Sequence, residues 1–157
     1  MDHIFLTNTY ARFLVDGFQA LIHNSEKYKY ERSPFALIKE HRTLRMDCGR
    51  QTGKSEAVDI FIRTLENKTD FAITHISHKL DYIKERRKLH KNVHWVSGSA
   101  RAICNPNFVH KFRGISTERR RVFIIEECHG YNHDKFIDNI LKIPFRTPPF
   151  IVVVGIQ

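Results

Sequence analysis

The sequence of 157 residues contains three cysteines, and none of them belongs to a C-x-x-C pair. Three widely spaced thiols are typical of a protein from a reducing cytosol and do not indicate a disulfide framework. No uninterrupted apolar run approaches the roughly 20 residues that a membrane-spanning helix requires. The opening Met-Asp-His does not resemble an export signal. Internal repeats, low-complexity tracts and Gly/Ser linkers are also missing, so we expect one folded domain over residues 1–157.

Negative charge is scarce relative to positive charge. The chain has 26 Lys and Arg against 17 Asp and Glu, which leaves a net charge of +9. Such an excess predicts a polyanionic partner, either a nucleic acid or an acidic membrane surface. The hydrophobic fraction of 41% is enough for a core. A domain of this length buries roughly two-thirds of its unfolded surface, so it requires neither disulfides nor a structural metal.

Short β-rich runs alternate with helical patterns along most of the chain. Apolar residues at helical spacing predict helices at residues 10–23, 34–40, 54–66, 78–90 and 134–142. Apolar and β-branched runs predict strands at residues 42–47, 71–76, 93–97, 122–126 and 150–154. This order predicts an α/β fold, with a mostly parallel sheet and helices on both faces. Ligands bind such sheets at the carboxyl ends of the strands.

A phosphate-binding pattern follows the first predicted strand. The pattern G-x-x-x-x-G-K-[ST] is met at Gly53, Lys54 and Ser55, but Cys48 replaces its first glycine. Lys54 would reach the β and γ phosphates of ATP, and the Ser55 hydroxyl would bind Mg²⁺. The predicted ATP-binding residues are Cys48, Gly49, Arg50, Gln51, Thr52, Gly53, Lys54 and Ser55. The alternative is a glycine-containing loop that only caps a helix, with Lys54 in solvent.

Two adjacent carboxylates, Glu126 and Glu127, stand at the end of the apolar run 122–125. A nucleotide hydrolase needs one carboxylate for the Mg²⁺ shell and one that accepts a proton from the attacking water. We assign Glu126 to the metal, together with Ser55, and Glu127 to the water as the catalytic base. The alternative is a pair of surface carboxylates that end a buried strand.

Together these motifs resemble the ATPase domain of phage terminase large subunits, the motors that package double-stranded DNA. The form Arg50-Gln51-x-Gly53-Lys54-Ser55 is typical of that family, which tolerates loss of the first glycine. Residues 112–116, Phe-Arg-Gly-Ile-Ser, resemble its R-G-x-S segment, and residues 71–89 fit the segment after its first helix. Residues 150–157 resemble its last strand and coupling motif, although this chain has Gly155-Ile156-Gln157 where terminases carry Ser/Thr-rich residues.

The resemblance implies a P-loop NTPase fold with three layers, in which residues 41–157 form the nucleotide-binding core. It implies that Arg50 is a catalytic arginine finger supplied in cis, alongside the catalytic Lys54 and Glu127. It also implies that Gly155 and Gln157 belong to the coupling motif that senses the γ phosphate. Residues 1–40 would form a helical segment on the adenine side, where the aromatic residues are Tyr28, Tyr30 and Phe35. Core packing is the alternative role of these aromatics.

The partners implied by the resemblance are double-stranded DNA, other copies of the chain in a ring, the capsid portal and the small terminase subunit. The resemblance also implies that the protein is viral, that it is located in the host cytoplasm and that it has no membrane partner. The family's metal-dependent nuclease domain is expected to be absent from residues 1–157. Two basic segments, 84–88 and 118–121, are candidates for contact with DNA phosphates, and plain solvated charge is their alternative.

Two other functions remain open from the sequence alone. Glu126-Glu127-Cys128-His129 resembles a D-E-x-H box with one substitution, which is typical of a helicase-like translocase. The second alternative is a nucleic-acid-binding module with a degenerate nucleotide site that does not hydrolyse ATP. The substitutions at Cys48 and Glu126 favour that module. Steady ATP turnover would indicate a motor and exclude the non-hydrolysing module.

Overall fold

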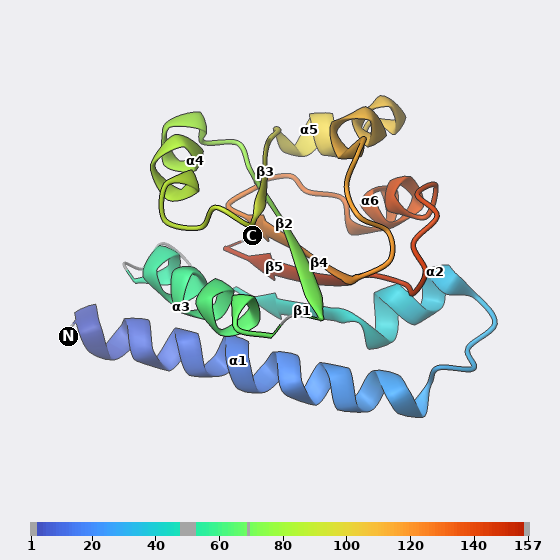
Figure 1. The fold of residues 1–157 in the computed structure, drawn as a ribbon, viewed down its shortest axis with the longest axis horizontal. Helices are drawn as coiled ribbons and strands as arrows, with labels where there is room; N and C mark the ends of the chain where they lie inside the picture. Colours follow the sequence, from blue (N-terminus) through green and yellow to red (C-terminus); the bar gives the residue numbers. More distant parts are fainter. Residues whose placement is uncertain (1–2, 48–52, 69, 156–157) are drawn as a thin grey trace.

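The computed structural model describes residues 3–47, 53–68 and 70–155 of the chain, with the side chains of residues 3–6 left out (Figure 1). Within these ranges the chain forms a sheet of five strands in the order β1-β5-β4-β2-β3. Every neighbouring pair of strands is parallel. The strands are β1 (Thr43–Met46), β2 (Phe71–Ser77), β3 (His94–Ser97), β4 (Arg120–Glu126) and β5 (Phe150–Val154). The predicted α/β fold with a parallel sheet is therefore confirmed.

The helices lie close to the predicted positions. They are α1 (His3–Lys27), α2 (Pro34–Ala36), the π-helix η1 (Leu37–His41), α3 (Lys54–Glu66), α4 (Leu80–Arg87), α5 (Ala100–Ile103), the 3-10 helix η2 (Pro106–Phe112) and α6 (His133–Ile140). The sequence did not predict α5 and η2. Each of these short helices begins with a side-chain cap: Ser99 accepts from the N–H of Ala102, and Asn105 accepts from the N–H of Asn107. Helices of four and seven residues carry too few apolar residues for a periodic signal.

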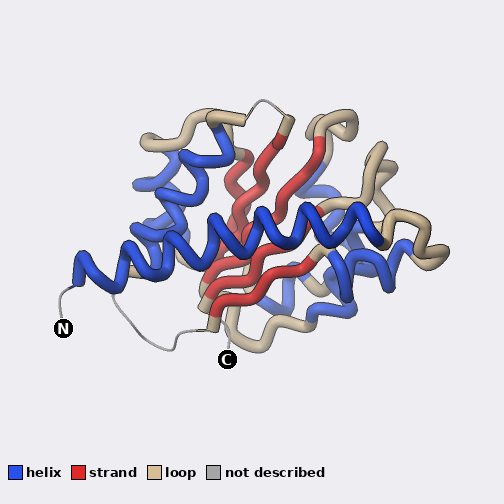
Figure 2. The backbone as a smooth tube through the Cα atoms, turned by 90° about the horizontal axis from the view of Figure 1, so that it is seen from below, coloured by secondary structure: helices blue, strands red, loops and turns tan. Residues whose placement is uncertain are grey.

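Helices cover both faces of the sheet and bury two separate cores. On one face, α1, α3 and α4 pack against alternate strand residues such as Val122 and Ile124. On the other face, α5, η2 and α6 pack against the intervening residues such as Phe123 and Ile125. Figure 2 shows α1 crossing in front of the sheet from one edge of the fold to the other. Because β4 and β5 are covered on both faces, their sequences are continuously apolar.

Candidate functional site

Three strands end side by side at the carboxyl edge of the sheet. Strand β5 lies between β1 and β4, so the segment after β1 and the acidic pair after β4 flank the end of β5. Two backbone hydrogen bonds extend the ladders past the strands. The N–H of Gly155 donates to Met46 O over 2.9 Å, and the N–H of Glu127 donates to Val154 O over 2.9 Å. This edge therefore joins the predicted phosphate loop and the predicted acidic pair.

Lys54 and Glu127 form an ion pair across this edge. Lys54 is the first residue of α3, and its Nζ lies 2.8 Å from Oε1 of Glu127. The side chains are 8% and 23% exposed, respectively. A buried ammonium group requires a charged or hydrogen-bonding partner, and Glu127 supplies one. Two residues that are 73 positions apart in the sequence thus meet.

Glycine at position 155 makes this contact possible. Gly155 has a φ of +74°, and a Cβ at this position would lie 2.4 Å from Oε1 of Glu127 and 3.2 Å from Nζ of Lys54. Any side chain would therefore push against the ion pair. Gly155 belongs to the predicted coupling motif, and the structure brings it into contact with both charged residues. Its predicted partner Gln157 lies outside the described residues.

Glu127 has an unusual backbone conformation. Its φ of +57° makes it the one residue other than glycine with positive φ among those the structure describes. The left-handed region costs most side chains roughly 1–2 kcal/mol, and such strain concentrates at functional sites. The turn aims the carboxylate back toward α3 instead of continuing the strand. His129 follows two residues later, with Nε2 at 4.0 Å from Oε2 of Glu127.

Glu126 points into the sheet face that α3 and α4 cover. Side chains alternate along a strand, so Glu126 shares a face with Val122 and Ile124 of the first core. It is 2% exposed, and its Oε1 has no hydrogen-bond partner in the described part of the chain. Its Oε2 lies 3.6 Å from Nε2 of His75, which is fully buried on β2. A carboxylate in this environment needs a cation or donors to offset its desolvation.

A phenol and a serine hydroxyl face the same carboxylate. Tyr82 on α4 is half-buried, and its pKa is raised by burial, by the charge of Glu126 and by hydrogen bonding to that carboxylate, whereas hydrogen bonding with Ser55 lowers it. The shared Mg²⁺ site predicted for Ser55 and Glu126 stays a prediction. The involvement of Tyr82 and His75 was not predicted.

Cys128 takes no part in this edge as a nucleophile. It is 1% exposed, and burial raises the pKa of its thiol to about 12. Only a thiolate is a strong nucleophile or metal ligand. Among the described residues, no group of three or more His, Cys, Asp or Glu is arranged to hold a metal ion. A Mg²⁺ site built from one carboxylate, one hydroxyl, water and nucleotide phosphates does not require such a group.

Several predicted site residues cannot be compared with the structure. Residues 48–52, which are Cys48, Gly49, Arg50, Gln51 and Thr52, lie outside the described ranges. Gly53, the next residue, has a φ of +96° and precedes α3. A Cβ there would lie 2.6 Å from Oγ1 of Thr7 near the start of α1. The start of α1 thus packs against the end of the predicted loop.

The adenine-side role of Tyr28, Tyr30 and Phe35 is not supported by their position. These residues precede β1, at the edge where its amino end lies, whereas Gly53 follows the carboxyl end of β1 (Figure 1). The long helix α1 carries the chain from one edge to the other, which separates the aromatics from the site. Tyr28 stacks on His41 at 3.9 Å between ring centroids, and Phe35 packs against the second core.

The two basic segments differ in the contacts and the exposure of their charged side chains. In the segment 118–121, Arg121 is buried and donates to Ser116 O over 2.8 Å, and Arg119 donates to Phe71 O. Arg120 lies over the ring of Phe71. These arginines make contacts within the fold, and contact of this segment with DNA stays a prediction. On α4 and just after it, Lys84, Arg87 and Lys88 are exposed, whereas Arg86 pairs with Asp59.

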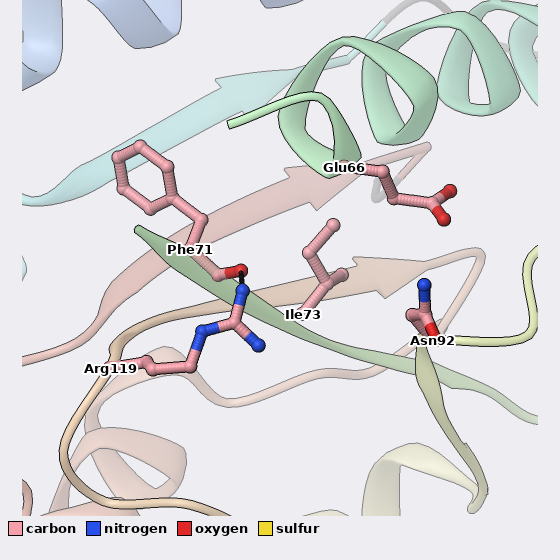
Figure 3. Close-up of a pocket in the computed structure, with 5 residues that line it drawn as sticks. All are labelled: Glu66, Phe71, Ile73, Asn92 and Arg119. Carbon is pink, nitrogen blue, oxygen red and sulfur yellow. Dashed lines mark hydrogen bonds between the residues drawn. The ribbon is translucent and has the colours of Figure 1, made fainter. Parts of the chain in front are cut away.

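A cavity of about 450 Å³ lies at the opposite edge of the sheet, lined by Glu66, Phe71, Ile73, Asn92 and Arg119. Figure 3 shows Arg119 and Phe71 on one side of Ile73, with Glu66 and Asn92 on the other. Phe71 and Ile73 lie near the start of β2, Asn92 and Arg119 lie just before β3 and β4, and Glu66 is the last residue of α3. The cavity is therefore remote from the acidic pair. It is separate from the predicted nucleotide site.

Comparisons with known proteins identify no relative: no family model matches the sequence, and neither a curated protein nor a solved structure matches the chain significantly. Within the described ranges, no helix has both the length and the apolar character needed to span a membrane. The proposed function therefore rests on the fold, the site geometry and the sequence motifs.

Proposed function

We propose that this protein is a Mg²⁺-dependent ATPase with a P-loop, and that it serves as the motor domain of a terminase-type DNA packaging enzyme. The observation that carries the ATPase proposal is the 2.8 Å contact between Lys54 and Glu127. It joins the end of a phosphate-loop motif to the end of an acidic strand, across a glycine that leaves room for nothing larger. The terminase part of the proposal rests on the sequence motifs.

Each charged residue at this edge has a role in the proposal. Lys54 binds the β and γ phosphates, and Ser55 and Glu126 hold Mg²⁺, which would neutralise charge on those phosphates. Glu126 suits this role because its buried Oε1 lacks a partner among the described residues. Glu127 accepts a proton from the attacking water. Arg50, by the terminase resemblance, stabilises the transferring phosphoryl group.

The ion pair connects the roles proposed for Lys54 and Glu127. Lys54 contacts the Glu127 carboxylate, and the two charges compensate each other where little water reaches them. A triphosphate brings several negative oxygens to Lys54 and competes for it. Glu127 then loses its partner and becomes available to the water. ATP binding and activation of the base are coupled in this way through one lysine.

Replacement of Lys54 tests the nucleotide site. We expect Lys54→Ala to weaken binding of a fluorescent ATP analogue in Mg²⁺ by roughly 10- to 100-fold, because charge-assisted hydrogen bonds contribute about 1.5–3 kcal/mol each. Lys39→Ala is the matched control, since Lys39 also pairs with a carboxylate, Asp134, but on the surface. It should bind like wild type. Equal affinity in Lys54→Ala and wild type would refute the site.

DNA binding is the second testable part of the proposal. We assign the contact to Lys84, Arg87 and Lys88, which are exposed on or next to α4. Affinity for duplex DNA should fall with salt by a log–log slope of about −0.9 for each phosphate neutralised. Arg87→Gln should reduce that slope by about one unit, and Lys142→Gln, after α6 on the other face, should not. A flat salt response would remove DNA from the partners of this domain.

A further inference from the structure

One continuous part of the sequence contains no acidic residue. Neither Asp nor Glu occurs between Glu85 and Glu118, although the whole chain contains 17 of them. The charged residues within residues 86–117 are Arg86, Arg87, Lys88, Lys91, Arg101, Lys111 and Arg113. These residues run from the end of α4 through β3 and α5 to η2. Much of the net charge of +9 is therefore concentrated in this part of the fold.

This acid-free segment passes around the outer edge of the sheet. Strand β3 is the last in the strand order, and β2 is its neighbour in the described sheet. Helix α4 packs on one face of the sheet through Ile83, and η2 packs on the other face through Phe108 and Phe112. Figure 1 shows α4 and α5 on either side of β3. The basic residues of the segment therefore lie on both sides of this edge strand.

Two contacts bring the end of α4 and the end of η2 to the same strand. After α4, the carbonyl oxygen of His90 accepts a hydrogen bond over 3.0 Å from Nε1 of Trp95 in β3. At the end of η2, the ring of Phe112 lies against the ring of His94, the first residue of β3, with centroids 6.3 Å apart. The residues that flank these contacts in the sequence are thus neighbours around the start of β3.

Five exposed cations lie around the start of β3, and we call them the basic edge. They are Arg87, Lys88, Lys91, Lys111 and Arg113. None of them forms an ion pair with a carboxylate in the part of the chain that the structure describes, whereas Arg86 pairs with Asp59. Glu118, the next acidic residue along the chain, pairs with Arg146. Like charges without a counter-charge repel one another, so this surface favours a polyanion.

The η2 side of the basic edge is open to a large partner. Gly114, which follows Arg113, has a φ of +82°, and a Cβ at this position would meet no atom within 4 Å. The start of β3 also lies at the amino edge of the parallel sheet, whereas the pair of Lys54 and Glu127 lies at the carboxyl edge. A partner bound to the basic edge therefore leaves the proposed nucleotide site accessible.

We propose that the basic edge binds the phosphate backbone of double-stranded DNA from both sides of β3, so that the contact assigned to α4 continues onto η2. This inference rests on the DNA part of the proposed function and is independent of the ATPase part. A duplex carries about one negative charge per 1.7 Å of its axis, so one molecule can contact both groups of cations. Contacts to the backbone provide affinity without reading the base sequence.

The salt dependence of duplex binding tests the η2 side. The dissociation constant of a labelled duplex is measured between about 50 and 200 mM salt for wild type, Lys111→Gln/Arg113→Gln and Arg12→Gln/Lys27→Gln. The last variant is the matched control, because it removes two exposed cations from α1, which packs on the opposite face of the sheet from η2. The log–log slope should become shallower by about two units in the η2 variant and should keep its wild-type value in the control. Both variants should bind the fluorescent ATP analogue like wild type.

Three results would overturn the inference. A wild-type slope in the η2 variant, together with a shallower slope in Arg87→Gln, would restrict the DNA contact to α4 and leave the proposed function standing. An equal change in the η2 variant and the α1 control would mean that net charge, and not the basic edge, determines binding. A wild type that does not bind duplex, whether or not it binds vesicles containing phosphatidylserine, would overturn the inference together with the DNA part of the proposed function. Binding of the ATP analogue decides the ATPase part separately.

Discussion

Glu127→Gln is expected to bind Mg²⁺-ATP and to leave it uncleaved, with hydrolysis slowed by roughly 10² to 10⁴. Glutamine keeps the size of the side chain but does not accept the proton of the attacking water. The contact with Lys54 at 2.8 Å adds a second expectation. Removal of the negative charge frees Lys54 for phosphate, so the affinity of the variant for ATP should not fall below that of wild type.

Single-turnover hydrolysis and equilibrium ATP binding should be measured on the same preparations. Glu126→Gln is the informative neighbour, because it should weaken Mg²⁺-dependent binding instead of the chemical step. Glu118→Gln is the matched control, since Glu118 pairs with Arg146 on the surface. Wild-type hydrolysis by Glu127→Gln would reject the base, and the reverse pattern at the two glutamates would move the assignment by one residue. A wild type that binds ATP without turnover would favour the non-hydrolysing module.

Phe123→Ala should lower the free energy of unfolding by about 3–5 kcal/mol, as for other buried phenylalanines. Phe123 lies in the strand that carries both glutamates and is fully buried. Its ring makes edge contacts with Phe112, Phe136 and Phe145, at centroid distances of 5.4 to 5.9 Å. Truncation therefore opens a cavity where three surrounding elements meet.

Urea denaturation followed by circular dichroism measures this change. Phe13→Ala is the control, because Phe13 on α1 is 47% exposed and its removal should change stability by no more than about 0.5 kcal/mol. Similar losses in both variants would contradict the second core as described. The comparison matters for function because β4 must hold Glu126 and Glu127 in place.

Much of the fold could be predicted from the sequence because apolar periodicity records burial directly. The runs at 122–125 and 150–154 are apolar without interruption, and they form the two strands that are covered on both faces. The prediction placed the start of β4 too late, at residue 122, whereas the strand begins at Arg120. Arginine is not expected in a strand interior, but here Arg121 donates hydrogen bonds to Ser116 O and to Oγ1 of Thr74.

The sequence motifs predict one part of the candidate site, and the other part depends on how the helices pack on the sheet. The motifs predicted that Lys54, Ser55 and the two glutamates would meet, because parallel strands bring their carboxyl ends to one edge. Tyr82 and His75 were missed because their approach to Glu126 depends on how α4 packs on the sheet. A buried-strand histidine, two residues before the end of β2, was the local signal in the sequence.

The sequence also could not predict where the amino-terminal aromatics lie. Helix α1 begins at His3 and ends at Lys27, beyond the predicted span 10–23 at both ends. At 1.5 Å per residue, a helix of this length covers the whole width of the sheet. Tyr28 therefore lies at the edge opposite Gly53. Thr7, near the start of α1, is the residue that approaches Gly53.

The left-handed backbone at position 127 has a cost in stability that the proposed function would explain. Glycine or asparagine would adopt a φ of +57° with less strain than glutamate does. Selection for folding alone would therefore favour a residue without a base at this position. Under the proposed function, glutamate at this position is a trade-off between backbone strain and the base that hydrolysis requires.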